Sequence, residues 1–128
     1  MTALMEVSPR DGLQNEAKPV STAQKLALIE SALAAGVKRI EVTSFVHPKK
    51  VPQLADAEAL CAALTPRPGV SLTGLVMNLR GVERAIATEV IDDIGMVIPA
   101  SDAFAQRNQG MTVDAACEEA LRVFERAA

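Results

Sequence analysis

The sequence predicts an α/β fold in which parallel strands alternate with helices. Four short apolar runs rich in β-branched residues are separated by longer segments with helical spacing, and residues typical of helix caps stand at the junctions. Each helical segment is long enough to return the chain to a parallel strand. The chain has 128 residues, 49% of them apolar, so its core is at most that of one ordinary domain.

The first helix has the clearest signals. Residues 3–7 form the first predicted strand and residues 39–43 the second. Between them, Ser21 and Gln24 have the spacing of a capping box, and Gly36 stands where a helix end requires left-handed backbone angles. The apolar side chains follow helical spacing at Leu26, Ile29 and Leu33. These features predict a helix that ends near Gly36.

The remaining elements continue the alternation. We predict a helix over residues 55–64, a strand over 70–76, a helix over 81–87 and a strand over 90–98. A fourth helix is predicted from Thr112 to the chain end, with acidic residues in its first turn. The order is therefore strand–helix repeated four times.

Two architectures have this order. One is an open, doubly wound parallel sheet, which is complete at this length. The other is a (β/α)8 barrel, which needs about 250 residues, so that this chain would supply four of its eight βα units. Hydrophobic periodicity does not choose between them.

Composition excludes several classes of function. Aromatic residues make up 2% of the chain and the formal net charge is −3, which is atypical of a nucleic-acid-binding protein. No apolar run approaches the roughly 18 residues of a membrane span, and no secretory signal pattern is present. Cys61 and Cys117 lack metal-binding spacing. We therefore expect a cytoplasmic protein without nucleic-acid or membrane partners.

Polar side chains gather directly after the first predicted strand. Ligands of parallel α/β folds bind at this end of the strands. Asp11 offers oxygens to a hard divalent cation, and Arg10 can hydrogen-bond a carbonyl or carboxylate on which charge develops. Gln14 adds a donor and an acceptor, and Gly12 allows a tight turn. The alternative is an ordinary surface ion pair in a turn.

Glu41 stands in the middle of the second predicted strand, between Ile40 and Val42. A carboxylate inside a buried strand is costly unless it is paired, so we expect it to face Arg10 or a metal held by Asp11. The alternative is a glutamate on an edge strand that faces water.

Two segments carry a resemblance to a known family. Residues 6–16, EVSPRDGLQNE, resemble the opening signature of hydroxymethylglutaryl-CoA lyases, and residues 41–46, EVTSFV, resemble the second-strand segment of the same family. Pro-Lys at 48–49 and Val-Pro-Gln at 51–53 extend the match. The shorter motif R-D-G-x-Q is shared with isopropylmalate and homocitrate synthases, but the longer match favours the lyases.

This resemblance implies a TIM barrel, with residues 1–128 as the N-terminal half of the lyase domain, cut in the fourth helix. It implies cleavage of 3-hydroxy-3-methylglutaryl-CoA, or a close 3-hydroxyacyl-CoA, to acetyl-CoA and acetoacetate. The implied cofactor is Mg²⁺ or Mn²⁺, and the implied partners are the acyl-CoA substrate and, in a full-length parent, further copies of the chain.

The resemblance also implies roles for individual residues. Asp11 would be a metal ligand, and Arg10 would stabilise the enolate or thioester oxygen. Glu41 would support the site beside Arg10, and Gln14 would lie close to the substrate. Three further residues would line the pocket or its rim: Ser44, Asn78 and Asn108.

The sequence departs from the family in several places. Ser8 stands where glycine is usual, and His47 stands where serine is frequent and is expected to be exposed. Two metal-binding histidines and a cysteine-bearing glycine-rich loop are missing, so we expect this chain alone to be inactive. The alternatives are a non-catalytic half-barrel that self-associates and the N-terminal part of a synthase-like acyltransferase.

Overall fold

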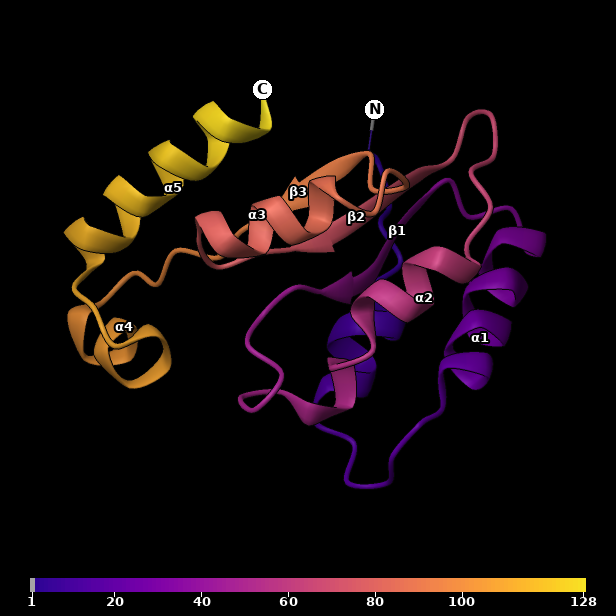
Figure 1. Cartoon of the computed structure of the whole chain (residues 1–128), viewed down its shortest axis with the longest axis horizontal. Helices are drawn as coiled ribbons and strands as arrows, with labels where there is room; N and C mark the ends of the chain where they lie inside the picture. The colour runs from indigo at the N-terminus through magenta and orange to yellow at the C-terminus, as the bar shows by residue number, and fades with distance from the viewer. Residues whose placement is uncertain (1) are drawn as a thin grey trace.

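A computed structural model of the protein describes residues 2–128 and contains a three-stranded parallel sheet, in the order β1-β2-β3 (Figure 1). The strands are β1 (Arg39–Ser44), β2 (Ser71–Leu75) and β3 (Asp93–Gly95). The α-helices are α1 (Thr22–Ala34), α2 (Ala57–Ala63), α3 (Leu79–Ile86), α4 (Asp102–Gln109) and α5 (Val113–Ala127). Two short helical segments precede α1 and α2: the π-helical turn η1 (Ser8–Gly12) and the 3-10 turn η2 (Pro52–Leu54).

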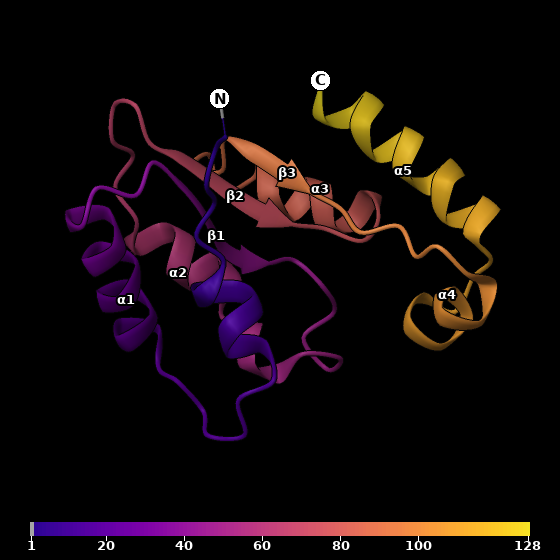
Figure 2. The same cartoon turned by 180° about the vertical axis from the view of Figure 1, so that it is seen from behind.

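The first predicted strand, residues 3–7, is the main error of the fold prediction. Only Glu6 pairs with the sheet, in a parallel bridge with Ile40 beside β1 (Figure 2). The Glu6 side chain accepts a hydrogen bond from the Ser8 N–H at 2.8 Å, and the chain then turns into η1. Leu4 is 85% exposed, so little apolar burial stabilises a longer ladder before Glu6.

The helix predicted between the first two strands is confirmed as α1. Ser21 caps it by accepting the Gln24 N–H, and the Gln24 side chain accepts the Ser21 N–H, which completes the capping box. The helix ends just before Gly36, whose φ of +96° is the left-handed conformation that favours glycine. Ile29 is fully buried, with Leu26 and Leu33 packed at its margin.

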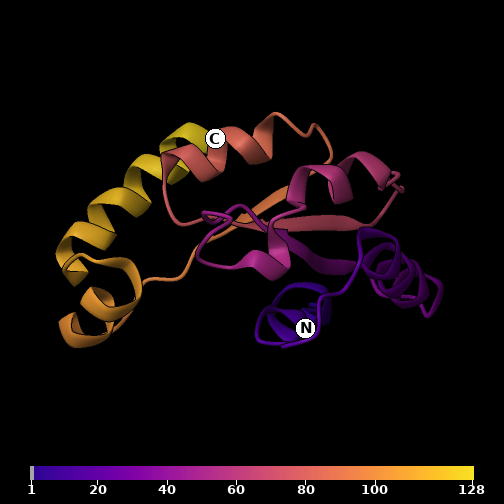
Figure 3. The same ribbon diagram turned by 60° about the horizontal axis from the view of Figure 1, so that its bottom comes forward.

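The core lies between the sheet and the helices on one of its faces. Figure 3 shows α2 and α3 on one side of the sheet and η1 on the other. The five residues of β1 from Ile40 onward are buried, so both faces of this strand are covered. The fully buried core side chains include Ile29, Ile40, Val42, Leu60, Cys61, Val76, Val82 and Val123. Within residues 2–128, no helix is long and apolar enough to cross a bilayer.

The region after β2 differs from the prediction at its boundaries and by one helix. α3 begins two residues earlier than expected because Asn78 caps it, and the last strand shrinks from residues 90–98 to β3. Helix α4 was not predicted. Of its residues only Ala105 is buried, so it has no apolar stripe, although Ser101 caps its start and Gly110 ends it at φ +72°. The predicted final helix is confirmed as α5, capped by Thr112.

Candidate functional site

An ion pair between Arg10 and Glu41 forms the centre of the candidate site. Glu41 on β1 is 5% exposed, and its Oε2 accepts a hydrogen bond from Arg10 Nε at 2.7 Å and forms an ion pair with Arg10 Nη2, also at 2.7 Å. The bridge between Glu6 and β1 brings η1 over this strand. The pairing expected from the sequence is therefore present. The alternative of a water-facing glutamate is wrong, because β1 is covered on both faces.

The third nitrogen of the Arg10 guanidinium bonds to one residue of η1 and to one that follows it. Nη1 donates to Asp11 Oδ1 at 2.9 Å and faces Gln14 Oε1 at 3.3 Å. The N–H groups of Asp11 and Gly12 both point to the Val7 carbonyl, as the π-helical turn requires. Arg10 is thus held by groups on two elements, and its guanidinium plane has a defined orientation.

Gly12 does not form the tight turn that the sequence predicted. It is the last residue of η1 and is absent from the positive-φ glycines of residues 2–128. A Cβ at this position would lie 3.3 Å from the Cβ of Ser8. The small residue is therefore explained by close packing against Ser8, the position where the sequence departs from its family.

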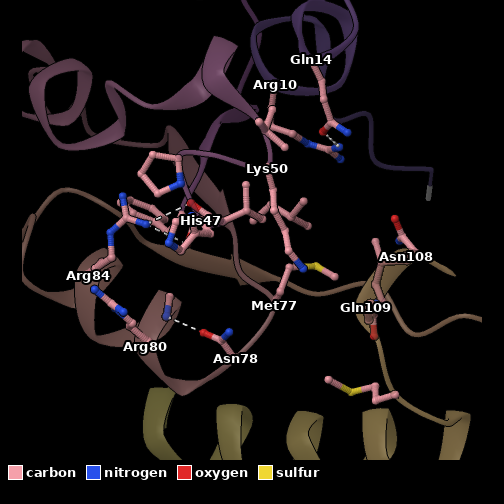
Figure 4. A pocket seen from close by; sticks show the side chains of 18 of the residues that line it. Arg10, Gln14, His47, Lys50, Met77, Asn78, Arg80, Arg84, Asn108 and Gln109 are labelled. Atoms are coloured by element: carbon pink, nitrogen blue, oxygen red, sulfur yellow. Dashed lines mark hydrogen bonds between the residues drawn. The ribbon is translucent and has the colours of Figure 1, made fainter. Parts of the chain in front are cut away.

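A hollow of about 760 Å³ opens beside Arg10 (Figure 4). Arg10 and Gln14 line one side of it, and Asn108 on α4 lies on another. Asn78, at the end of β2, also lines it. The connections that follow Glu6, β1, β2 and β3 therefore contribute to one pocket, because the ends of parallel strands meet at one edge of the sheet.

The pocket lining is cationic, although the whole chain has a net charge of −3. Lys50, Arg80 and Arg84 join Arg10 there, and the lining contains no Asp or Glu. Arg84 is held in place, donating to the Phe45 carbonyl at 3.0 Å and forming an ion pair with Glu58. That pairing lowers the pKa of the Glu58 carboxyl from its ordinary value. Such a lining suits a negatively charged ligand.

Arg80 and Lys50 are the lining cations whose side chains have no protein partner. Within residues 2–128, no hydrogen bond or ion pair engages the Arg80 guanidinium or the Lys50 ammonium group. Figure 4 shows both side chains at the hollow. Sequence reasoning did not identify Arg80, although its position two residues after Asn78, at the end of a strand, was a usable signal.

Three predicted site residues, Ser44, Asp11 and Glu41, are not among the residues that line the pocket. Ser44 is buried within β1, and its Oγ faces the Val46 N–H at 3.3 Å. Its role at the pocket or its rim therefore stays a prediction. Asp11 lies outside the lining with its side chain 63% exposed, and Glu41 reaches the site only through Arg10.

Asn78 has a structural role as well as its place in the pocket. Its Oδ1 accepts the Gly81 N–H at 3.0 Å and caps α3, which leaves its amide NH₂ group for a ligand. His47 is exposed, as expected, and its Nδ1 accepts the Lys49 N–H at 3.2 Å. It nevertheless lines the pocket.

The cysteines do not contribute to the site. Cys61 is fully buried in the core, and burial raises the pKa of its thiol to about 11, so it stays protonated and unreactive. Cys117 is exposed on α5, away from the pocket lining.

The described residues offer a divalent cation one carboxylate near Arg10. Asp11 has one oxygen bonded to Arg10 and is otherwise open to solvent. Between residues 2 and 128, no three His, Cys, Asp or Glu side chains come together as a metal site would require. Since Mg²⁺ prefers six ligands, these residues fit at most one position of its coordination shell.

A family model and curated proteins similar to this chain point to the same family. A family model described as HMGL-like matches residues 1–128. A 3-hydroxy-3-isohexenylglutaryl-CoA/hydroxymethylglutaryl-CoA lyase of Pseudomonas aeruginosa is 43% identical over 97% of this chain and 41% of its own length. The mitochondrial hydroxymethylglutaryl-CoA lyase of Macaca fascicularis is 39% identical over 95% of this chain and 36% of its own. The chain thus spans about two fifths of the length of these relatives.

Solved structures agree with these relatives. The crystal structure of the P. aeruginosa hydroxymethylglutaryl-CoA lyase superposes with a TM-score of 0.91 at 42% identity, covering 98% of this chain and 41% of that one. An HMG-CoA lyase from Acinetobacter baumannii, in complex with coenzyme A and 3-methylmalate, gives 0.91 at 35% identity, covering 97% and 40%. Sequence and fold together show that the chain belongs to the HMGL-like family and corresponds to the N-terminal part of TIM-barrel hydroxymethylglutaryl-CoA lyases.

Proposed function

We propose that this chain contributes the Arg10 side of the active site of a divalent-metal-dependent lyase. The proposed reaction is cleavage of 3-hydroxy-3-methylglutaryl-CoA to acetyl-CoA and acetoacetate. The observation that carries the proposal is the Arg10 guanidinium, oriented by buried Glu41 at the edge of a cationic pocket. The names of the relatives, which are lyases of this substrate class, support it.

The chemistry needs a base and a means to stabilise an enolate. A base takes the proton of the tertiary hydroxyl, its oxygen becomes the ketone of acetoacetate, and the adjacent carbon–carbon bond breaks. The electron pair of that bond moves onto the acetyl-CoA fragment, whose thioester oxygen becomes negative, and a proton then completes the methyl group. Arg10 can donate to that oxygen, and the charge that develops there is where a preorganised donor lowers the barrier most.

Glu41 is proposed as the residue that orients Arg10. With Nε and Nη2 held by the Glu41 carboxylate, the guanidinium presents its Nη1 edge toward Asp11 and Gln14. A charged donor that is already oriented needs little reorganisation during the reaction.

Asp11 is proposed as one ligand of Mg²⁺ or Mn²⁺. When bound, such an ion polarises oxygens of the substrate. Glu41 is engaged by Arg10, and no three potential ligand side chains come together within residues 2–128, so Asp11 would be the one carboxylate that this part of the chain offers, held beside Arg10.

The opposite side of the pocket is proposed to hold the coenzyme A portion. Coenzyme A carries phosphate groups, and the partnerless Lys50 and Arg80 side chains offer cations to them. Asn78, Asn108 and Gln14 add neutral polar groups along the hollow. The relative solved with coenzyme A covers 97% of this chain, which is in keeping with this proposal.

The pocket also has an apolar wall that bears on the choice of acyl group. Met77, Phe104 and Met111 line it together with Val97. The P. aeruginosa relative is named for a substrate with a 3-isohexenyl group as well as for the 3-methyl compound. A second candidate substrate is therefore a 3-hydroxyglutaryl-CoA with a longer apolar substituent, and the ratio of kcat/KM for the two thioesters decides between them.

The test is an assay for acetoacetate with a polypeptide that carries this chain together with the remaining length of a relative. Arg10→Gln is expected to lower kcat by about 100-fold or more, because a charged donor to the enolate oxygen is lost. Arg122→Gln, on the exposed face of α5, is the matched control and should leave kcat unchanged. An Arg10→Gln variant with kcat within twofold of the parent would remove Arg10 from the reaction.

A further inference from the structure

The segment between η1 and α1, residues 15–20, has an unusual anchor. It has no regular secondary structure, and its residues 15–19 are exposed. The side chain of Gln53, on η2, nevertheless makes three hydrogen bonds to its backbone. Gln53 Nε2 donates to the Glu16 carbonyl at 3.2 Å and the Lys18 carbonyl at 3.0 Å, and Gln53 Oε1 accepts the Val20 N–H at 2.9 Å.

Gln53 is itself held by a buried lysine. Lys25 on α1 is 1% exposed, and its ammonium group donates to the Gln53 carbonyl and to Asp56 Oδ1, the latter at 2.6 Å. Asp56 also accepts the Thr22 hydroxyl at 2.6 Å. The buried ammonium group is thus paired with an ionised carboxylate and bonded to the Gln53 main chain, which makes this network a firm support for Gln53.

This anchor holds the chain shortly after η1 ends at Gly12. The start of η1 is tied to β1 by the Glu6 bridge and by the pair of Arg10 with Glu41. After η1 ends at Gly12, Leu13 and Gln14 lead directly into the segment that Gln53 binds, and the Glu16 N–H bonds back to the Leu13 carbonyl at 3.0 Å. Gln14 lines both the main pocket and a second hollow that includes Gln53.

We propose that Gln53, supported by Lys25, is a positioning residue that holds the far end of η1 and so orients Arg10 and Gln14 at the pocket. Three neutral hydrogen bonds tie the connection that follows Glu6 to the connection that follows β1. Motion at this end of η1 is thereby limited, although the segment itself is exposed. The expected effect of Gln53 on kcat rests on the proposed lyase function, whereas its effect on the position of η1 does not.

Hydrogen exchange of the chain tests the positioning without any assay of activity. Gln53→Met keeps the size of the side chain and removes its hydrogen bonds, and Gln106→Met, on the exposed face of α4, is the matched control. In Gln53→Met the amides of Val20, Asp11 and Gly12 should exchange about tenfold faster, while those of β2 do not change. Faster exchange at Val20 alone, with Asp11 and Gly12 unaffected, would overturn the proposal.

The unmodified chain provides a second measurement in case Gln53→Met does not fold. In low concentrations of urea, the Val20 and Gly12 amides should exchange with the same dependence on urea, because one local opening exposes both. A Gly12 amide that stays protected where Val20 exchanges would also overturn the proposal.

The lyase assay then separates this inference from the proposed function. Gln53→Met should lower kcat about tenfold and leave KM for the acyl-CoA unchanged, because the Gln53 side chain makes no hydrogen bond to Lys50 or Arg80, the cations proposed to bind coenzyme A. An inactive parent with the expected exchange pattern would refute the proposed function alone. An active parent whose kcat does not respond to Gln53→Met would refute the catalytic role of the positioning.

Discussion

The buried carboxylate of Glu41 requires a charged partner, and Arg10 is that partner. The Glu41 side chain is almost inaccessible, and an isolated carboxylate in that position would be strongly destabilising. The hydrogen bond and ion pair with Arg10 offset that cost and leave the guanidinium in one orientation. A buried ion pair of this kind adds little to the free energy of unfolding, and its main effect here is to fix the orientation of the Arg10 guanidinium.

A double-mutant cycle on this pair has a clear expected outcome. Arg10→Met leaves Glu41 buried without a partner and should lower the free energy of unfolding by about 3 kcal/mol in urea denaturation. Combining it with Glu41→Met should recover most of that loss, since two apolar side chains of similar volume replace the pair. The exposed pair of Arg126 with Glu83 is the control, and Arg126→Met should cost less than about 1 kcal/mol. Equal costs at the two sites would contradict our account of Glu41.

At the scale of single elements, helices α1 and α4 show two ways to begin a helix. Both start at a capping serine, Ser21 and Ser101, and both are followed by a glycine with positive φ. Helix α1 buries Ile29 beside Leu26 and Leu33, and this face made it predictable, whereas α4 buries only the small Ala105. Helix α4 depends on its caps and on contacts with α5, including the bond from the Val113 N–H to Asp102 at 2.7 Å.

The capping box of α1 is open to a direct test. Ser21→Ala removes the acceptor for the Gln24 N–H and should lower the free energy of unfolding by about 1 kcal/mol. Ser31→Ala is the matched control, because Ser31 is exposed in the middle of the same helix and bonds only to the Ala27 carbonyl. That change should be neutral or slightly stabilising. A larger loss at Ser31 than at Ser21 in urea denaturation would contradict the capping assignment.

At the scale of the whole molecule, ion pairs connect the helices to one another. Lys25 and Asp56 link α1 to the start of α2, and Arg84 and Glu58 link α3 to α2. Partial burial of Asp56 disfavours its charged form, but hydrogen bonds from Lys25 and Thr22 outweigh this effect and hold its pKa below the ordinary value. The pairing with Arg84 lowers the pKa of Glu58 in the same way. Both carboxylates therefore have to stay ionised for these links to persist.

Stability should accordingly fall in acid. A carboxyl whose pKa is lower in the folded state stabilises the fold above its unfolded pKa, about 4, and this contribution is lost as the pH falls through the folded value. The urea midpoint should therefore drop from pH 5 to pH 3. Asp56→Asn should lower the midpoint at pH 7 and make its acid dependence shallower. Glu125→Gln, an exposed control on α5, should leave both unchanged; an Asp56→Asn variant with the parent's acid profile would contradict this reading.

The elements that could be predicted are those whose local signals agree with their burial. The α1 capping box, the β-branched run of β1 and the cap of α5 each predicted the observed element. The first predicted strand failed because its apolar residues are not covered, and α4 was missed because it buries only Ala105. The spacing of apolar residues predicts an element only when the folded protein buries those residues. Where they stay exposed, or where a helix buries almost none, the spacing gives a wrong prediction or none.

The sequence by itself determined the alternation of strands and helices, the family through its two long motifs, and the identity of Arg10, Asp11 and Glu41 as candidate site residues. Only the tertiary structure decided that Ser44 is buried, that Arg80 lines the pocket, and that Gln53 reaches across to the segment after η1. Each motif is a short continuous segment, so its residue types and their spacing can be recognised without the fold. Contacts between residues far apart in sequence depend instead on where parallel strands end and which side chains the turns between them bring together.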